Sequence, residues 1–275
     1  MLVDRTFIRL TEGLMHYRYA GSSNSSSLPL LMMHPSPASS VAMEPLMQAI
    51  GSAHQLIAPD TLGCGDSAAP SPDAPDLPYY ADSMLRFLDA MDIEQCHVYG
   101  SHTGAHIGIE LAILAPQRIK TLTLDGVAVL GEEEKQDFLE NYAPPQSIDE
   151  HGGHYARVWQ YVRDQMVFFP HYKKDDAHRR EGGDFSAKGL HSINMDLLKN
   201  LDHYHKTYNA VFRQPVLERL AQVPSNVMLL TSLEDPLHFA VEAMMEAKPD
   251  IKLCEFPKDK ASDKASAIID LINKT

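Results

Sequence analysis

The stretch HVYGSHTGAHIG, residues 97–108, places a histidine where it could take part in chemistry. A short apolar run ends at Gly100, a turn of small residues follows, and an apolar-periodic segment begins directly afterwards. This pattern predicts a strand, a sharp turn and a helix, with His102 at the centre of the turn between Gly100 and Gly104. Histidine gains and loses a proton near neutral pH, so an imidazole raised on such a turn could act as a general base.

Ser101 is the neighbouring residue that could also place a reactive oxygen on the turn. A tight strand-to-helix turn needs small residues two positions before and two positions after its centre. Centred on His102 these positions are the two glycines, whereas centred on Ser101 they would be Tyr99 and Thr103, which would crowd the turn. The spacing therefore predicts His102 at the centre, with Ser101 beside it as a residue that contacts substrate.

Strands and helices alternate along most of the chain, and they would have to position this turn. A hairpin is expected over residues 6–20. Buried strands are expected at residues 28–33, 55–58, 96–99, 119–126, 226–232 and 251–256. Helical spacing occurs at residues 41–50 and 78–92, from residue 103 and from residue 262. This alternation predicts an α/β fold, with a mostly parallel central sheet and helices on both faces.

Residues 132–222 interrupt the alternation, because their patterns are helical only. Residues 189–212, GLHSINMDLLKNLDHYHKTYNAVF, are predicted as one continuous helical segment. A helical block inserted between two strands of a sheet is typical of a lid or cap. The sequence therefore predicts a core of residues 1–131 and 223–275 and an inserted helical cap of residues 132–222.

Composition narrows the class of protein. The 275 residues include 37 acidic and 24 basic residues, for a formal net charge of −13. A surface of that sign repels phosphate backbones and anionic lipid, so neither nucleic acid nor a membrane is expected as a partner. The N-terminal segment has no signal-peptide pattern and no apolar run is long enough to span a bilayer, which favours a cytoplasmic location. The 3 scattered cysteines indicate reduced thiols rather than disulfides or a metal site.

Four segments in this order resemble the α/β-hydrolase superfamily. LLMMHPSP is similar to the strand and loop that hold the oxyanion hole, and IAPDTLGCGDSAAP to the segment A-P-D-x-x-G-x-G-x-S. VYGSHTGAHIGIELAILAPQRIKTLTLDG resembles the nucleophile elbow with its helix and the next strand, and NVMLLTSLEDP the strand and loop that present the catalytic acid. The resemblance implies the α/β-hydrolase fold. No cofactor is expected, because no phosphate-cradling glycine motif follows the first strand.

The resemblance also implies a Ser–Asp–His triad in chain order, and this sequence departs from it at two positions. His102 stands at the place of the nucleophile, in G-S-H-T-G, and the loop over residues 256–265, where the base is expected, contains no histidine. Asp235 stands where the acid is expected. Asp125, just after the strand that follows the elbow helix, is a second candidate to orient His102.

The oxyanion hole and the substrate contacts are expected by position. The backbone N–H groups of Ser36 and Thr103 would stabilise an oxyanion. The residues expected to contact substrate lie on the first loop, the elbow, the predicted cap helix and the loop after the acid: His34, Ser101, His154, Arg157, Trp159, Tyr161 and His238.

We interpret the sequence as a hydrolase-like enzyme that cleaves an ester, a lactone or a C–C bond in a small carbonyl-containing molecule. His102 would act as a general base on water or on a substrate carbon, with no cofactor and no metal ion. Three alternatives stay open: direct attack by the His102 imidazole, a cofactor-independent lyase, and a non-catalytic small-molecule-binding or scaffold protein. The sequence is compatible with a homodimer but does not specify the oligomeric state.

Overall fold

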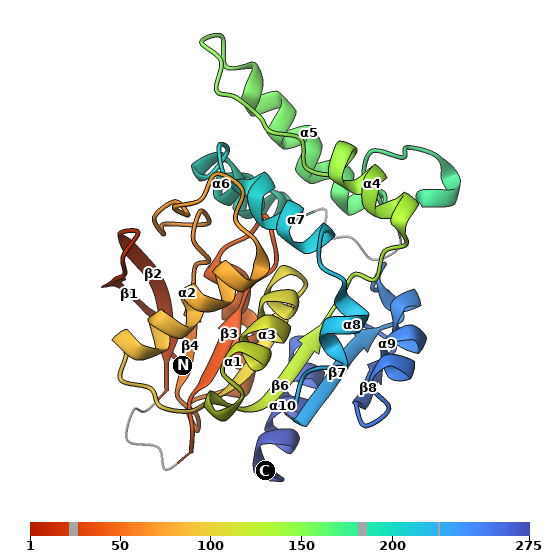
Figure 1. Cartoon of the computed structure of the whole chain (residues 1–275). Coiled ribbons are helices and arrows are strands. Elements are labelled where there is room, and N and C mark those ends of the chain that lie inside the picture. The colour runs from red at the N-terminus through yellow and green to blue at the C-terminus, as the bar shows by residue number, and fades with distance from the viewer. Residues whose placement is uncertain (22–26, 181–185, 225) are drawn as a thin grey trace.

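The computed structural model describes residues 1–21, 27–180, 186–224 and 226–275. Within these residues eight strands form one sheet in the order β1-β2-β4-β3-β5-β6-β7-β8 (Figure 1). The strands are β1 Asp4–Arg9, β2 Leu14–Ala20, β3 Leu30–Met33, β4 Leu56–Pro59, β5 Cys96–Ser101, β6 Ile119–Asp125, β7 Asn226–Ser232 and β8 Lys252–Phe256. β2 is antiparallel to β1 and to β4, and all the other neighbours are parallel. The predicted hairpin and mostly parallel sheet are confirmed.

Helices cover both faces of this sheet. The α-helices of the described residues are α1 Glu44–Ile50, α2 Leu77–Ala90, α3 Thr103–Leu114, α4 Glu132–Asn141, α5 Gly153–Val167, α6 Ala187–Lys199, α7 Tyr204–Phe212, α8 Val216–Leu220, α9 Val241–Ala247 and α10 Ala261–Asn273. Alternate side chains of β3 point to opposite faces, as in any strand. Leu31 and Met33 pack with α2 and α3, whereas Leu30 and Met32 pack with α1 and α10. Continuous apolar strands are therefore buried between two helical layers.

Helix α3 follows the elbow and is the most enclosed helix of the fold. Every residue from Thr103 to Ala112 is buried. The helix contacts β3, β5 and β6 on one side and α2, α7 and α8 on the others. A helix with apolar residues on every side is expected to be surrounded in this way. The fixed position of α3 in turn fixes the turn that precedes it.

Between β6 and β7 the chain forms α4 to α8. Helices α4 to α7 lie beyond the carboxyl ends of the strands, whereas α8 lies beside the sheet against α3 and α9 (Figure 1). The prediction of one continuous helix over residues 189–212 is wrong, because the chain turns between α6 and α7. The Asn200 side chain donates to the carbonyl oxygen of Gly65 at 3.0 Å, and the Asn200 carbonyl accepts from the N–H of His203 and Tyr204. The hydrogen bond with the distant Gly65 and the local turn together end α6. Local periodicity does not reveal the contact with Gly65.

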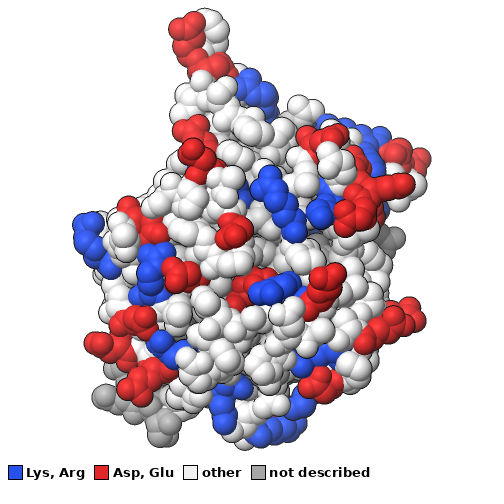
Figure 2. All heavy atoms as spheres, in the orientation of Figure 1, with Lys and Arg blue, Asp and Glu red and all other residues white. Residues whose placement is uncertain are grey.

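On the face shown in Figure 2, acidic and basic side chains alternate over the surface without a large basic patch. No helix among the described residues combines the length and apolarity needed to cross a membrane.

A buried polar network joins α3 to the segment between α7 and α8. The His106 ring accepts from the N–H of Ala128 at 3.0 Å, and its other nitrogen contacts the side-chain oxygen of Gln214. Glu110, one turn further along α3, accepts from Gln214 and from Nε and Nη2 of Arg219. Burial lowers the pKa of His106 to about 4, so the ring is neutral in the folded protein.

We predict that His106 makes the fold sensitive to acid. The unfolded chain binds a proton on this histidine below about pH 6.5 whereas the folded chain does so only near pH 4, so protons favour unfolding between these values. Going from pH 7 to pH 5 should remove on the order of 2 kcal/mol of the free energy of unfolding through this group. Denaturant unfolding of the wild type and of His106→Gln at both pH values measures the difference.

The matched control is His151→Gln, since the side chain of His151 is 87% exposed. His106→Gln should lose less free energy on acidification than the wild type, and His151→Gln should lose as much. Equal losses in all three proteins would contradict a role for His106 in acid sensitivity.

Candidate active site

The elbow predicted at His102 is a strained turn in the structure. β5 ends at Ser101, α3 begins at Thr103, and His102 lies between them with φ 48° and ψ −109°. A positive φ is unfavourable for a residue with a Cβ and persists only where the surroundings enforce it. Here the His102 N–H donates to the Asp125 carbonyl at 2.7 Å, and the His102 carbonyl accepts from Ala105 at 2.8 Å.

The two flanking glycines are required by the closeness of three backbone segments. A Cβ on Gly100 would lie 2.3 Å from the carbonyl oxygen of Gly104. A Cβ on Gly104 would lie 2.3 Å from the carbonyl oxygen of Met33, on the neighbouring strand. No side chain fits at these distances, so the G-x-x-x-G spacing fixes His102 at the vertex.

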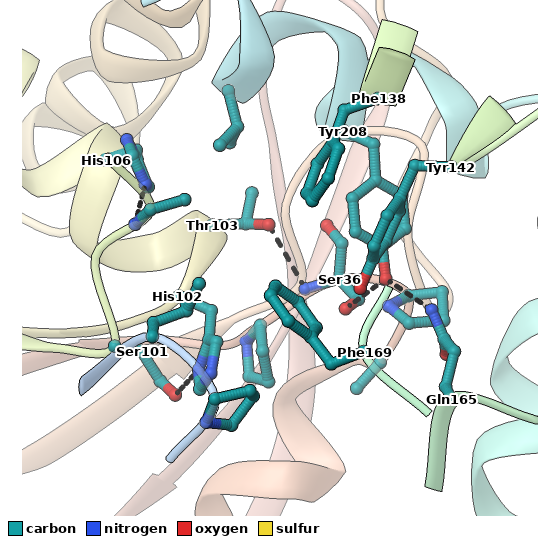
Figure 3. Close-up of a pocket in the computed structure, with 18 of the residues that line it drawn as sticks. Ser36, Ser101, His102, Thr103, His106, Phe138, Tyr142, Gln165, Phe169 and Tyr208 are labelled. Carbon is teal, nitrogen blue, oxygen red and sulfur yellow. Dashed lines mark hydrogen bonds between the residues drawn. The ribbon is translucent and has the colours of Figure 1, made fainter. Parts of the chain in front are cut away.

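The His102 imidazole lies between a carboxylate and a hydroxyl. Its Nε2 is 3.7 Å from Oδ2 of Asp235, and its Nδ1 is 3.2 Å from Oγ of Ser101 (Figure 3). The ring is seated against Gly126, where an added Cβ would lie 2.7 Å from Nε2. The His102 side chain is 41% exposed and the Asp235 side chain 8%. An ionised carboxylate can accept hydrogen bonds but cannot donate them. Asp235 therefore favours the tautomer of His102 that has its proton on Nε2 and its lone pair on Nδ1.

Asp125, the second candidate partner, directs its carboxylate elsewhere. Oδ2 of Asp125 accepts from the Tyr99 hydroxyl and from Nζ of Lys264, the latter at 2.6 Å. Lys264 also binds Asp259 at 2.8 Å. Burial alone would lower the pKa of Lys264, but the two facing carboxylates outweigh it and raise that pKa. Asp125 therefore belongs to a buried ion pair, and it contacts His102 through its backbone carbonyl.

A cavity of about 360 Å³ opens beside the elbow. Figure 3 shows Ser101 and His102 at one end and Phe138, Tyr142 and Tyr208 at the other. The lining comes from the elbow, the first loop, the segment after β6, the helices that follow it and the loops after β7 and β8. Its members include Pro35, Ser36, Pro37, Ser101, His102, Thr103, Gly126, Phe138, Tyr142, Gln165, Phe169, Arg180, Tyr208, Phe212, Leu237 and Asp259. The aromatic residues make this cavity largely apolar.

Ser36 and Thr103, the expected oxyanion donors, lie side by side on the cavity wall. The Ser36 N–H donates to Oγ1 of Thr103 at 3.3 Å (Figure 3). The Ser36 hydroxyl pairs with Thr207 at 2.8 Å, and its carbonyl accepts from the Tyr208 hydroxyl at 2.7 Å. The side chain and the carbonyl of Ser36 are therefore both held by residues of α7, a helix that lines the cavity.

His34 and His238 lie outside the cavity lining. The buried His34 ring contacts the Pro35 carbonyl at 2.9 Å and accepts from the N–H of Thr61 at 3.0 Å, so it joins two loops of the core. His238 contacts Thr231 at 3.2 Å and Glu255 at 3.5 Å, and it borders a separate surface hollow. The expected substrate contacts of these two histidines have no counterpart in the cavity.

The predicted contacts on α5 also fall outside the lining. His154 and Arg157 bind Asp149 at the start of the helix, at 2.8 Å through the backbone N–H and at 3.0 Å through the guanidinium. Trp159 is 44% exposed on the outer side. Tyr161 is buried and receives a hydrogen bond from the cavity residue Gln165 at 3.2 Å. Helical spacing predicts which residues share a face of a helix, but it does not predict which part of the protein that face contacts.

Several lining residues were not predicted. Gln165 donates to the hydroxyls of Tyr161 and Tyr208 at 3.2 Å each. Burial raises the pKa of Tyr142 to about 12, so its phenol keeps its proton. Asp259 lies in the loop after β8, where the resemblance places the base. This position in the sequence could have identified Asp259 as a lining residue. The remaining residues converge from separate helices, which leaves no local pattern.

A group that could hold a metal ion lies away from the cavity, at His16, Asp60 and Asp66. Asp60 accepts from His16 at 2.9 Å, from the N–H of Ser40 at 2.8 Å and from the N–H of Asp66 at 2.9 Å. Although burial opposes it, these donors keep the pKa of Asp60 below its usual range. The protein's own donors thus satisfy this carboxylate, which indicates a structural role in the loop after β4.

We predict that Lys264→Met lowers the free energy of unfolding by about 3–5 kcal/mol, because it leaves Asp125 buried without a cation. Adding Asp125→Asn should recover part of this loss, since the uncompensated charge is then removed. Denaturant unfolding of the two variants measures both effects. Lys258→Met is the control, because its side chain is 68% exposed and it should change stability by less than about 0.5 kcal/mol. A loss equal to the control's would show that the ion pair is dispensable.

Comparison with known proteins agrees with this geometry. A 2-hydroxymuconate semialdehyde hydrolase of Pseudomonas sp. (strain CF600) is 32% identical over 108 residues, 38% of each chain. A putative carbamate hydrolase RutD of Azorhizobium caulinodans is 38% identical over 81 residues, 29% of this chain and 30% of its own. The chain thus matches well under half the length of these relatives.

Solved structures resemble the chain over nearly its whole length. MGS-M2, an alpha/beta hydrolase enzyme from a Medee basin deep-sea metagenome library, superposes with a TM-score of 0.77 at 14% identity, covering 98% of both chains. The sequence profile of the alpha/beta hydrolase fold family matches residues 29–168, about half of the 275 residues. The protein therefore belongs to the α/β-hydrolase fold family.

Proposed function

We propose that this protein is a hydrolase that acts on a small carbonyl-containing molecule, with His102 as the general base and Asp235 as its partner. The observation that carries the proposal is the position of His102, which lies at the vertex of the elbow, on the cavity wall and 3.7 Å from Asp235. The two relatives named above, a semialdehyde hydrolase and a putative carbamate hydrolase, support the class of reaction.

In this proposal His102 takes a proton from the attacking hydroxyl as the new bond to the carbonyl carbon forms. The imidazolium that results is stabilised by Asp235, whose side chain is 8% exposed and therefore weakly screened by water. A contact of 3.7 Å is longer than a hydrogen bond, and such contacts commonly tighten when substrate binds. The pair needs neither a metal ion nor a cofactor for this step.

The oxyanion would be stabilised by the backbone N–H groups of Ser36 and Thr103. Ser36 presently donates to Oγ1 of Thr103 over a long 3.3 Å, so a negatively charged substrate oxygen is the stronger acceptor for this N–H. The Thr103 N–H belongs to the first turn of α3, where backbone donors have no partner within the helix. Both groups lie on the cavity wall next to His102.

The helices of residues 132–222 would act as the cap over the cavity and set the choice of substrate. They supply Phe138, Tyr142, Phe169 and Tyr208 to the lining, and a cavity of about 360 Å³ fits a small molecule. A substrate with an apolar or aromatic body and a carbonyl group directed at the elbow fits this arrangement best.

We predict that His102→Ala lowers kcat/KM at least about 10³-fold, because the proton acceptor is removed. Asp235→Asn should lower it by about 10²–10⁴-fold, since the base loses its partner. The measurement is turnover by purified protein on short-chain esters, thioesters, lactones and 1,3-diketones, which also separates C–O from C–C cleavage.

His151→Gln is the control for a histidine outside the site and should keep wild-type turnover. Turnover that survives His102→Ala would overturn the proposal. If the folded wild type hydrolyses no compound of the series at any concentration, the proposed substrate class is wrong.

A further inference from the structure

The atom that faces the lone pair of His102 is the hydroxyl oxygen of Ser101. Asp235 lies on the Nε2 side of the ring and favours a proton there, so Nδ1 is the basic nitrogen. Nδ1 is 3.2 Å from Oγ of Ser101, within hydrogen-bonding distance (Figure 3). The three side chains thus stand in the order carboxylate, imidazole and hydroxyl, which is the order that activates a serine.

The rule that excludes Ser101 from the vertex does not exclude its hydroxyl from reacting. The glycine spacing concerns the backbone, and Ser101 is the last residue of β5, one position before the strained residue. Its side chain lines the cavity although the residue is only 8% exposed. The hydroxyl is therefore shielded from bulk water and within reach of a molecule in the cavity.

The second neighbour of this hydroxyl, the Tyr99 phenol, is not a competing base. Burial, followed by the nearby Asp125 carboxylate, holds the pKa of Tyr99 well above its usual value, so the phenol stays neutral. Tyr99 donates its own proton to Asp125 and offers Ser101 only a weakly basic oxygen. The imidazole is the stronger proton acceptor, so the single hydroxyl proton of Ser101 is directed to Nδ1 of His102.

We infer that Ser101 is the nucleophile of the reaction and that His102, at the vertex, is the base that activates it. The inference rests on the proposed function and names the hydroxyl that His102 deprotonates. It places both roles on the elbow, because the vertex holds the base and the residue before it holds the attacking oxygen, whereas the resemblance places the base in the loop after β8.

The reaction then has two balanced halves. Oγ of Ser101 attacks the carbonyl carbon while its proton passes to Nδ1 of His102, and the leaving group departs with that proton as its bond to the carbonyl carbon breaks. Water next attacks the acyl ester on Ser101 and gives a proton to Nδ1. That proton returns to Oγ of Ser101 as the acid is released, which restores the starting state.

A fluorophosphonate probe tests this inference without knowledge of the substrate, because it phosphonylates an activated serine and loses fluoride. We expect one phosphonyl group on the wild type, mapped by peptide mass spectrometry to Ser101. Ser101→Ala should take up none, and His102→Gln should react at least about 10²-fold more slowly because the base is absent. An unlabelled wild type, or an adduct mapped to His102 or to another residue, would overturn the inference.

Turnover separates a nucleophile from a residue that merely orients His102. Ser101→Ala should lower kcat at least about 10³-fold if Ser101 attacks, whereas loss of an orienting hydrogen bond alone should lower it about 10-fold or less. Turnover that survives Ser101→Ala but not His102→Ala would overturn this inference and leave the proposed function standing. Labelling at Ser101 together with no hydrolysis of any ester, thioester or lactone would support the inference and count against the proposed substrate class.

Ser101→Cys is a second variant, which tests the inference even if Ser101→Ala does not fold. Sulfur is larger than oxygen but keeps the nucleophilic position, and His102 should promote its thiolate. We expect iodoacetamide to alkylate the new thiol at least about 10-fold faster than it does in the Ser101→Cys/His102→Gln double variant. Equal rates would show that His102 does not act on this position. Thermal unfolding of each variant beside the wild type reports whether the fold is kept.

Discussion

The close approach of three backbone segments at the end of β5 determines the site. The carbonyl oxygens of Met33 and Gly104 come so near to Gly104 and Gly100 that neither position accepts a side chain. The chain therefore turns within one residue, and that residue, His102, takes a positive φ. Such strain is kept only where the surrounding packing outweighs it. Here β3, β5 and the enclosed helix α3 supply that packing.

The ionisable side chains near the elbow are arranged differently from the Ser–Asp–His triad of the family. The loop after β8 brings no imidazole, and it places Asp259 on the cavity wall and beside Lys264 instead. Lys264 in turn neutralises Asp125, which leaves Asp235 as the carboxylate beside His102. Asp125 and Asp259 thus share the Lys264 ammonium while Asp235 faces the His102 imidazole, so each of these carboxylates has a cationic or ionisable partner.

The strands, their mostly parallel order and the vertex at His102 could be predicted because they follow from local patterns. Apolar runs mark strands buried on both faces, and two glycines four residues apart mark a turn without room for side chains. The break between α6 and α7 could not be predicted, since it depends on a hydrogen bond from Asn200 to the distant Gly65. Short elements such as α9 (residues 241–247) carry too few residues to show a period.

The residues of the site were harder to predict than its location. The spacing identified His102 and the small set beside it, but the aromatic wall is assembled from α4, α7 and the segment after α5, which are far apart in sequence. Conversely, His154 and Arg157 have the residue types of a binding site, yet the His154 ring accepts from the N–H of Asp149 and the Arg157 guanidinium donates to the Asp149 carboxylate. A side chain's chemistry suggests what it could bind, and only the tertiary structure decides which partner is nearest.

The network of His106 and Glu110 also joins α3 to a second part of the structure. The helix starts directly after His102, and one and two turns later its side chains bind Gln214 and Arg219, where the chain returns from α7 to the sheet. The elbow and the C-terminal end of the helical segment over residues 132–222 are therefore held by the same helix. A displacement of α3 would move both together, whereas α4 and α5 contact α7 and α6 instead.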